Sequence, residues 1–310
     1  MSLTESIKDR PWRNLPFTDI YKRAKRSLLT GQERQMCYWL SREWYSGEGA
    51  IVDLGSFLGS STVAFAAGLA EREDGLGHVH AYDLFEVSRD QETQRFLNKK
   101  EGDSFLEDFQ STIAGFEDKI SVNAGDIKQF PWEGGPIEIF FVDLAKSWEM
   151  NEYIIQAFYP YLIPGKSILI HEDFGNSWNP WLPVSMGYLE PFFQFLGDEC
   201  PSRLYHCASI PTAEALTVNY KEDLDRETRL RCMDHSLACS SDEMLFRLHG
   251  SKAILTFIED GKEAGMEYID SVWAAMEASE QEQEFMQTVR STIDFWNHGW
   301  AYENEMATKF

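Results

Sequence analysis

Residues 51–62 read IVDLGSFLGSST, and this stretch decides the fold. It starts with apolar residues, reaches Asp53, and then passes two glycines, Gly55 and Gly59, before hydroxyl side chains that can cap a helix over 62–71. A strand, a glycine-containing turn and a helix start therefore follow one another directly. This order is typical of the first unit of a parallel sheet that holds a ligand at its carboxyl edge.

Four further apolar runs follow, and each also ends close to a charged residue. The five runs are 50–52 before Asp53, 78–82 before Asp83, 120–124 before Asp126, 137–142 before Asp143, and 167–170 before His171, Glu172 and Asp173. Short continuous apolar runs indicate strands that are buried on both faces, as in a parallel sheet. With helical patterns between them, they predict an α/β fold with a doubly wound, mostly parallel, seven-stranded sheet.

The segments between and after the runs complete this prediction. Helical spacing marks residues 105–116 and 150–162, and the second pattern stops at Pro164-Gly165. Residues 127–136 are too few for a full crossover helix, so a single helical turn is expected there. Two segments, 203–209 and 214–220, flank Pro211-Thr212 and predict an antiparallel hairpin at one sheet edge.

The chain divides into three predicted parts: an N-terminal helical segment (1–48), a central domain (49–221) and an acidic helical C-terminal extension (222–310). Residues 259–310 hold 12 acidic and 3 basic side chains. A solvated helix face explains this charge, and partner recognition is the alternative. One helix face is expected to carry Phe285, Val289, Ile293, Trp296 and Trp300, which suit burial against another helix, either within the chain or in a homo-oligomer.

Composition excludes several classes of function. The chain has 310 residues, with 28 Lys and Arg against 51 Asp and Glu, for a net charge of −23. This charge disfavours binding to nucleic acid or to an anionic membrane, and the cluster Lys22, Arg23, Lys25 and Arg26 is expected to be a solvated helix face. With no signal-like or membrane-spanning run and an odd number of cysteines, five, the sequence predicts a soluble cytoplasmic protein with reduced thiols.

The acidic strand ends indicate the ligand. Carboxylates gathered along one crevice repel one another unless a cationic or hydroxyl-rich ligand lies between them, although Asp at one or two strand ends is an ordinary helix cap. Phe57 replaces the second glycine of the dinucleotide fingerprint, which disfavours a nucleotide-dependent oxidoreductase. A ligand with a ribose but no pyrophosphate remains, and S-adenosylmethionine fits this description.

At these motifs the chain resembles class I S-adenosylmethionine-dependent methyltransferases, which have a Rossmann-like fold. The resemblance spans about residues 32–220 and rests on IVDLGSFLGSST, HVHAYDLFE, VNAGDI, IEIFFVDLAKSWE and LIPGKSILIHEDF. It implies that Asp83, beside Leu84, binds the ribose and that Asp126 lies near the adenine amino group. The residues that it assigns to the methionine part of the cofactor are Asp53, Gly55, Ser56 and Gly59.

Within this class, the fourth and fifth runs are similar to the macrocin O-methyltransferase group and, more distantly, to catechol O-methyltransferase. This resemblance implies Mg²⁺ bound by Asp143, Glu172 and Asp173, with Asp143 also at the cofactor, and it makes Lys146 the candidate catalytic lysine. The catechol enzyme has an Asp-Asn pair where this chain has Glu172-Asp173, so the individual ligands are open. Carboxylate oxygens suit Mg²⁺.

Two residues compete for the role of general base. The pKa of Lys146 would have to fall by roughly three units from about 10.4, and only a bound cation would produce this fall among so many carboxylates. His171 starts near a pKa of about 6.5 and needs no metal. The aromatic stretch Trp178, Trp181, Tyr188, Phe192 and Phe193 is expected to wall the acceptor pocket or to pack in the core.

The sequence thus favours a methyltransferase that acts on a hydroxyl of a small molecule such as a sugar, a natural product or a phenolic compound. An oxidoreductase of similar topology is one alternative. The other is a methyltransferase-like scaffold without activity that works as an interaction protein through its acidic helices.

Overall fold

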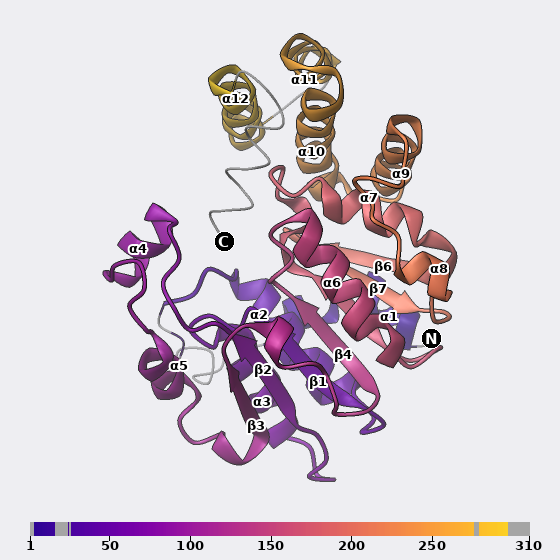
Figure 1. The fold of residues 1–310 in the computed structure, drawn as a ribbon. Coiled ribbons are helices and arrows are strands. Elements are labelled where there is room, and N and C mark those ends of the chain that lie inside the picture. The colour runs from indigo at the N-terminus through magenta and orange to yellow at the C-terminus, as the bar shows by residue number, and fades with distance from the viewer. Residues whose placement is uncertain (1–2, 16–23, 25, 276–278, 297–310) are drawn as a thin grey trace.

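The computed structural model of the chain describes residues 3–15, 24, 26–275 and 279–296. Its centre is a seven-stranded sheet in the order β3-β2-β1-β4-β5-β7-β6 (Figure 1). The strands are β1 (Ala50–Leu54), β2 (Val79–Asp83), β3 (Ile120–Ala124), β4 (Ile137–Val142), β5 (Ile168–His171), β6 (Phe193–Glu199) and β7 (Ser202–Cys207). The first five strands pair in parallel, and β7 runs antiparallel to both β5 and β6. The predicted α/β sheet with an antiparallel hairpin at one edge is therefore confirmed.

Helices precede, connect and follow the strands. The α-helices are α1 (Leu3–Lys8), α2 (Gly31–Trp39), α3 (Ser60–Ala70), α4 (Gln91–Leu97), α5 (Leu106–Ile113), α6 (Trp148–Phe158), α7 (Trp181–Tyr188), α8 (Ala213–Leu216), α9 (Arg226–Ala238), α10 (Asp242–Asp260), α11 (Lys262–Ala275) and α12 (Glu280–Phe295). A π-helical turn, η2 (Leu40–Trp44), continues α2. Short 3-10 turns are η1 (Pro11–Asn14), η3 (Glu117–Lys119), η4 (Ile127–Gln129), η5 (Tyr159–Tyr161), η6 (Glu172–Gly175) and η7 (Glu190–Phe192).

The strands send alternate side chains into two cores. In β4, Ile139 and Phe141 join the core formed with α2, α3 and α5, whereas Phe140 and Val142 join the core formed with α6 and α7. Alternation is the normal geometry of a strand. Both faces of β4 are apolar because helices cover both, which explains its uninterrupted apolar run.

The predicted position of the hairpin was wrong in one of its two strands. The first predicted strand overlaps β7, but the partner of β7 is β6, which precedes it across the turn at Cys200-Pro201. Residues 213–216 form helix α8 instead of a strand. The hydroxyl of Thr212 accepts a hydrogen bond from the Ala215 amide (3.2 Å), so this residue caps a helix where a turn was expected.

The crossover between β3 and β4 is short, as predicted. Within it, η4 is the single helical turn. None of the described helices combines the length and apolar character that crossing a bilayer requires. All five cysteines are free thiols.

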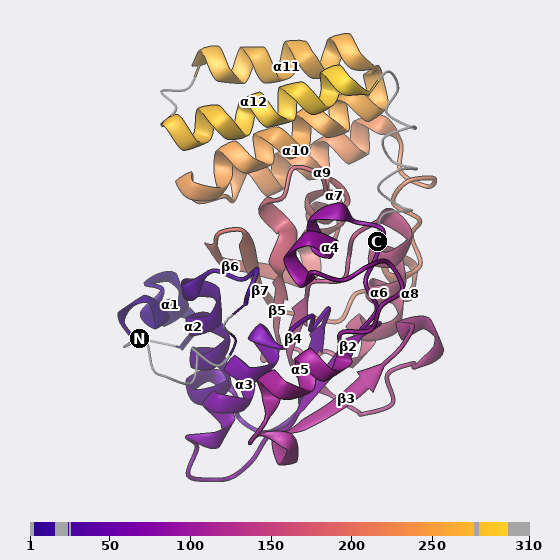
Figure 2. The same ribbon diagram turned by 90° about the vertical axis from the view of Figure 1, so that its left-hand side faces the viewer.

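The C-terminal extension is helical and joins the rest of the molecule through α9 and α10 (Figure 2). Met233, Met244 and Leu248 belong to the same core as α6 and α7. Helices α10, α11 and α12 enclose a third core, separate from the two beside the sheet, which includes Val289 and Ile293 as predicted. Trp300 lies outside the described residues, as do Lys22, Arg23 and Lys25.

The N-terminal segment meets the extension at the turn between β6 and β7. Glu199, at the end of β6, accepts hydrogen bonds from Trp12 Nε1 (2.5 Å) and from Arg13 Nη2 (2.6 Å). Glu243, in the first turn of α10, pairs with Arg10 (2.6 Å) and Arg13 (3.2 Å). Segments from the two ends of the chain are therefore held at one point.

Candidate active site

A cavity of about 270 Å³ opens at the carboxyl ends of the parallel strands. It lies where the strand order reverses, with β2 and β3 on one side of β1 and β4 and β5 on the other. This is the usual ligand site of an open parallel sheet. Eight of the predicted site residues line it: Gly55, Ser56, Asp83, Leu84, Asp143, Lys146, Glu172 and Asp173.

Gly55 allows the first loop to pass close to the end of β4. Its φ is +83°, and a Cβ at this position would lie 2.6 Å from the carbonyl oxygen of Asp143. No other residue type fits there without displacing the β4 backbone. The Gly55 amide also donates to the Tyr82 carbonyl (2.9 Å), which ties the loop to β2.

Asp83 holds two loops with its two carboxylate oxygens. Oδ2 accepts the amide of Phe57 (2.8 Å), and Oδ1 accepts the amide of Phe85 (2.7 Å). Both phenylalanines have positive φ, 46° and 52°, a conformation that costs a residue other than glycine about 1–3 kcal/mol. Burial raises the pKa of Asp83 to about 6, and the two amides act against this rise.

Asp53 does not face the cavity, so its predicted contact with the cofactor has no support in this geometry. Its side chain is fully buried and accepts hydrogen bonds from the hydroxyls of Ser61 (2.9 Å) and Thr62 (2.5 Å). Burial raises its pKa to about 7, although these hydroxyls oppose the shift. Asp53 therefore fixes the first turn of α3 against β1.

Gly59 and Asp126 are also outside the cavity wall. Gly59 is the residue before α3 and has φ +85°. A Cβ at this position would lie 3.2 Å from the Phe109 side chain and 3.3 Å from the Ile113 side chain, both on α5. Asp126 caps η4 by accepting the amide of Lys128 (2.9 Å). Since β3 is an edge strand, its end lies farther from the reversal point than the ends of the other parallel strands. The assignment of Asp126 to adenine stays a prediction.

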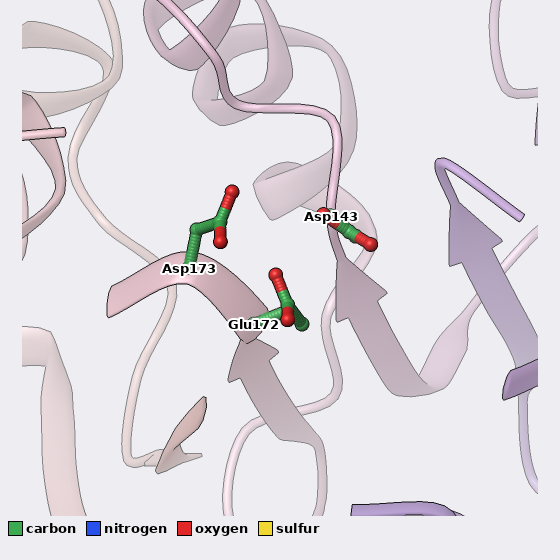
Figure 3. Close-up of side chains that lie close together, drawn as sticks. All are labelled: Asp143, Glu172 and Asp173. Atoms are coloured by element: carbon green, nitrogen blue, oxygen red, sulfur yellow. The ribbon is translucent and has the colours of Figure 1, made fainter. Parts of the chain in front are cut away.

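Three carboxylates form a cluster at the other end of the cavity (Figure 3). Asp143 follows β4, whereas Glu172 and Asp173 lie in η6 directly after β5. One oxygen from each residue lies within 4.8 Å of the others. The pairing of β4 with β5 explains this convergence, because residues at the ends of adjacent parallel strands are neighbours.

The ammonium group of Lys146 lies among these carboxylates. It pairs with Asp143 (2.5 Å) and with Asp173. Burial favours the neutral amine, but the neighbouring carboxylates outweigh it and hold the pKa of Lys146 well above its ordinary value. Lys146 is therefore protonated in this arrangement, which agrees with the expectation for a lysine without a nearby cation.

The carboxylates divide into two kinds. Burial disfavours ionisation of Asp173, but Lys146 attracts its charge and lowers its pKa. Burial and the repulsion of Asp143 and Asp173 raise the pKa of Glu172 well above the ordinary value. A proton on Glu172 thus relieves a repulsion that a divalent cation would also relieve.

The donor set fits Mg²⁺. Three oxygen ligands are close enough to share one ion, and hard oxygen ligands are the ones that Mg²⁺ prefers. The carboxylates of Asp143 and Asp173 are partly exposed to the cavity, with side-chain exposures of 23% and 19%, so an ion has access to them. Within the described residues, this is the one group of three or more potential ligands that meets such a distance limit.

The structure does not position His171 to act as a base, so its catalytic role has no support in this geometry and stays a prediction. It is fully buried, and a hydrogen bond joins its Nε2 to Tyr159 Oη (2.9 Å). Its Nδ1 finds no hydrogen-bond partner in the described part of the chain, and burial lowers its pKa to about 3. Strand alternation places His171 on the same side of β5 as Leu169, toward α6 and α7.

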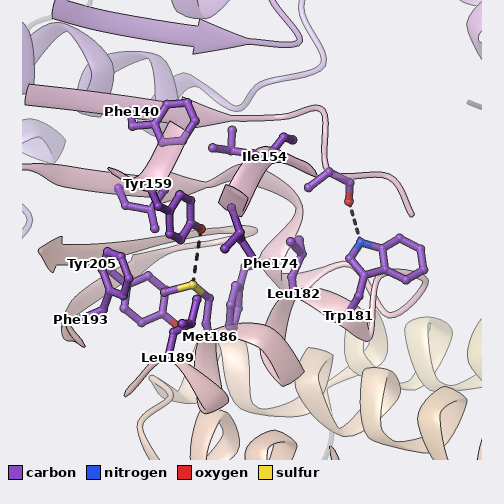
Figure 4. Packing of buried hydrophobic residues seen from close by; sticks show 14 of the residues in the cluster. Phe140, Ile154, Tyr159, Phe174, Trp181, Leu182, Met186, Leu189, Phe193 and Tyr205 are labelled. Carbon is purple, nitrogen blue, oxygen red and sulfur yellow. Dashed lines mark hydrogen bonds between the residues drawn. The ribbon is translucent and has the colours of Figure 1, made fainter. Parts of the chain in front are cut away.

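Two residues of the aromatic stretch after β5, Trp181 and Phe193, pack in the core (Figure 4), and none of the five residues of that stretch lines the cavity. Trp181 is 1% exposed and donates to the carbonyl of Ala145 (2.6 Å). Phe193 is buried against Tyr159, with ring centroids 5.4 Å apart. This was the alternative that the sequence analysis left open.

The cavity also contains residues that the sequence analysis missed. Leu28 and Leu29 reach it from the N-terminal segment. Glu86, Ser88 and Thr93 come from the segment that follows β2. The sequence could have suggested Glu86 as a cavity residue, because it is acidic and follows the predicted ribose-binding Asp83 by three residues. No local sequence pattern marks Leu28 and Leu29.

Residues 52–172, from β1 to the start of η6, match the model of a family described as a methyltransferase domain. This match confirms the predicted resemblance to a methyltransferase over these residues. No curated protein matches the chain.

Solved structures of O-methyltransferases are similar to this chain at low identity. The O-methyltransferase NovP is 11% identical over 59% of this chain and 83% of its own, with a TM-score of 0.47. CalS11, a TDP-rhamnose 3'-O-methyltransferase of calicheamicin biosynthesis, is 17% identical over 66% and 93%, with a TM-score of 0.43. An O-methyltransferase from Bacillus cereus in complex with SAH is 13% identical over 66% and 96%, with a TM-score of 0.39.

Proposed function

We propose that this chain, in which residues 52–172 form a methyltransferase domain, transfers the methyl group of S-adenosylmethionine to a hydroxyl of a small molecule such as a sugar, a natural product or a phenolic compound. One observation carries the proposal. The glycine loop with Asp83 and the carboxylate cluster with Lys146 line the same cavity. A methyl donor and an acceptor bound at these two ends would therefore meet inside it.

The donor end of this cavity offers groups that suit the cofactor. Asp83 can accept hydrogen bonds from ribose hydroxyls, because each carboxylate oxygen retains a free lone pair after accepting one amide. Gly55 and Ser56 bring the backbone close to the space that the methionine part would occupy. The acidic lining also favours a positively charged sulfonium.

The acceptor end supplies orientation and deprotonation. Asp143, Glu172 and Asp173 would hold Mg²⁺, which supplies the acidification of a coordinated hydroxyl. Lys146 is an ammonium group here and thus donates hydrogen bonds. It would become a base only after Asp143 and Asp173 ceased to pair with it, and ligation of a metal by these carboxylates would have that effect.

S-adenosylhomocysteine tests the cofactor site in the full-length protein. At about 100 times its dissociation constant it should stabilise the fold by about 2.7 kcal/mol, which is visible as a higher melting temperature. The variant Asp83→Ala should lose this shift, whereas Asp118→Ala, which removes an exposed carboxylate within η3, should keep it. A shift that survives in Asp83→Ala contradicts the ribose assignment, and no shift in the wild type would favour an inactive scaffold.

Chelation tests the metal. Methyl transfer from labelled S-adenosylmethionine to a panel of glycosides and phenolic compounds should fall on addition of EDTA and return with excess Mg²⁺. Asp173→Asn should lower the affinity for Mg²⁺ while leaving the S-adenosylhomocysteine shift in place. Activity that is indifferent to EDTA would remove the metal from the proposal.

A further inference from the structure

The turn that carries two of the three carboxylates is packed tightly against helix α10 of the C-terminal extension. Gly175 ends η6, two residues after Asp173. A Cβ at Gly175 would lie 2.7 Å from Met244 Sδ and 3.1 Å from Arg247 Cδ, both on α10. The turn thus has no free space on this side.

The contact continues over the next two residues. Gly250 of α10 lies so close to Ser177 that an added Cβ would be 3.1 Å from the Ser177 Cβ. The hydroxyl of Ser251 lies 3.5 Å from the Asn176 carbonyl oxygen, and the Asn176 amide donates to the Asp173 carbonyl (3.0 Å). Three successive residues after the carboxylates therefore rest on α10.

The hairpin also holds the turn. The Gly175 amide donates to the Pro201 carbonyl (2.9 Å), and the neighbouring Ser202 donates to the buried Glu33 (2.6 Å). The first residue before α10, Ser241, donates its amide to Asp198 of β6 (2.9 Å). The hairpin thus fixes both the turn and the start of the helix that supports it.

The geometry points to α10 as a positioning element for the metal-binding turn, acting through the contact between Met244 and Gly175. This inference rests on the proposed function, because it concerns the affinity of the cluster Asp143, Glu172 and Asp173 for a divalent cation. Mutation of residues that orient metal ligands from the outer shell typically lowers metal affinity by about 10- to 100-fold. The extension would thus complete a site whose ligands all lie in the methyltransferase domain or directly after it.

Isothermal calorimetry with Mn²⁺ alone, on the full-length protein, tests this inference. Gly175→Ala pushes the turn away from Met244, and Met244→Ala removes the support, so each should weaken Mn²⁺ binding by about tenfold or more. In the double variant the new methyl group occupies the vacated space and should restore most of the affinity. The binding of S-adenosylhomocysteine should stay at the wild-type level in all three, which shows that they are folded.

Met286→Ala is the matched control. Met286 is buried like Met244 but lies in the third core, between α10, α11 and α12, so its loss should leave Mn²⁺ affinity unchanged. Wild-type affinity in both Gly175→Ala and Met244→Ala would overturn the inference, and so would additive losses in the double variant or an equal loss in Met286→Ala. If Met244→Ala does not bind S-adenosylhomocysteine, this variant is not folded, and the Mn²⁺ affinity of Gly175→Ala alone decides whether the inference holds. A wild-type protein that binds no Mn²⁺ would instead overturn the metal in the proposed function.

Discussion

Asp83 connects local backbone strain to ligand binding. Its carboxylate holds Phe57 and Phe85 in conformations that these residues rarely adopt. The rings then pack around Phe105, at centroid distances of 5.3 and 5.7 Å, which places apolar surface beside the cavity. One side chain thus shapes the wall and offers acceptors to the ligand.

The raised pKa of Asp83 predicts opposite pH effects on stability and on binding. Since the folded-state pKa is about 6 and the ordinary value is 3.8, the folded protein keeps a proton between these pH values that the unfolded chain has lost. The contribution of Asp83 to stability therefore falls as pH rises through this interval, by on the order of 3 kcal/mol in total. S-adenosylhomocysteine needs the ionised acceptor, so its affinity should rise about tenfold per pH unit up to pH 6.

Calorimetry of S-adenosylhomocysteine binding from about pH 5 to pH 8 measures this rise. The Asn side chain of the variant Asp83→Asn is about as large as Asp but does not titrate. The variant should therefore bind S-adenosylhomocysteine more weakly, with an affinity that does not change between about pH 5 and pH 8. A wild-type affinity that is flat below pH 6 would show that the ligand does not depend on this ionisation.

His171 should be dispensable for chemistry. Because it is buried and bonded to Tyr159, His171→Phe should keep kcat within about twofold and leave the pH profile of methyl transfer unchanged. It should cost about 1–3 kcal/mol of unfolding free energy in urea, since the Tyr159 hydroxyl loses its hydrogen bond to the imidazole and keeps only the weak acceptor Met186 Sδ. Lys146→Met, by comparison, should lower kcat by about 100-fold or more. A large loss of kcat in His171→Phe would restore the histidine as the base.

The sequence indicated which residues gather at the cavity better than it indicated which way they point. Gly55, Asp83 and Asp143 follow strand ends and face the ligand space as predicted. Asp53 lies within β1 and His171 ends β5, so strand alternation directs both into the packed layers. Counting alternation along each strand was the available signal for the orientation of these two side chains.

At the level of elements, the hairpin of β6 and β7 joins the sheet to the extension. The Arg203–Asp198 pair has both side chains fully buried, with Nε 2.7 Å from Oδ1. Asp198 also accepts the amide and the hydroxyl of Ser241, both at 2.9 Å, immediately before α10. The position of this hairpin was not evident from the sequence, because β6 mixes buried and exposed residues and follows directly on aromatic helix-like segments.

Asp198→Ala should be strongly destabilising. It leaves Arg203 buried without its carboxylate and frees the start of α10, so unfolding in urea should show a loss of about 3–5 kcal/mol. Asp270→Ala breaks an ion pair with Arg290 in which the Asp270 side chain is 49% exposed and the Arg290 side chain 40%. This variant should lose less than about 1 kcal/mol of unfolding free energy. Equal losses in the two variants would show that the buried pair has no special weight.

For the whole molecule, the predicted boundary at residues 221 and 222 runs through a shared core. Helices α9 and α10 contribute Met233, Met244 and Leu248 to the core of α6 and α7, whereas α11 and α12 pack with α10 around the third core. The sequence predicted the helices but not this division, because apolar spacing identifies a buried face without identifying its partner. The predicted homo-oligomer through these helices stays a prediction.

Two truncations should behave differently. A chain ending at Gly261 keeps the core of α6 and α7 intact and should retain the melting-temperature shift with S-adenosylhomocysteine. A chain ending at Lys221 exposes the surface that α9 and α10 cover and should show no cooperative unfolding transition. A ligand-induced shift in the shorter chain would contradict the shared core. Light scattering on the full chain and on the longer truncation would show whether α11 and α12 mediate assembly.

The two edges of the sheet are protected in different ways. Edge strand β3 is short, whereas β6 is longer and lies against α1 and α2 of the N-terminal segment. An uncovered edge strand is a template on which other chains can add strands. Proteolytic trimming before Gly31 would therefore leave the cavity residues of β1 to β5 in place but remove α1 and leave β6 covered by α2 alone, and the trimmed molecules would be more prone to polymerise edge to edge.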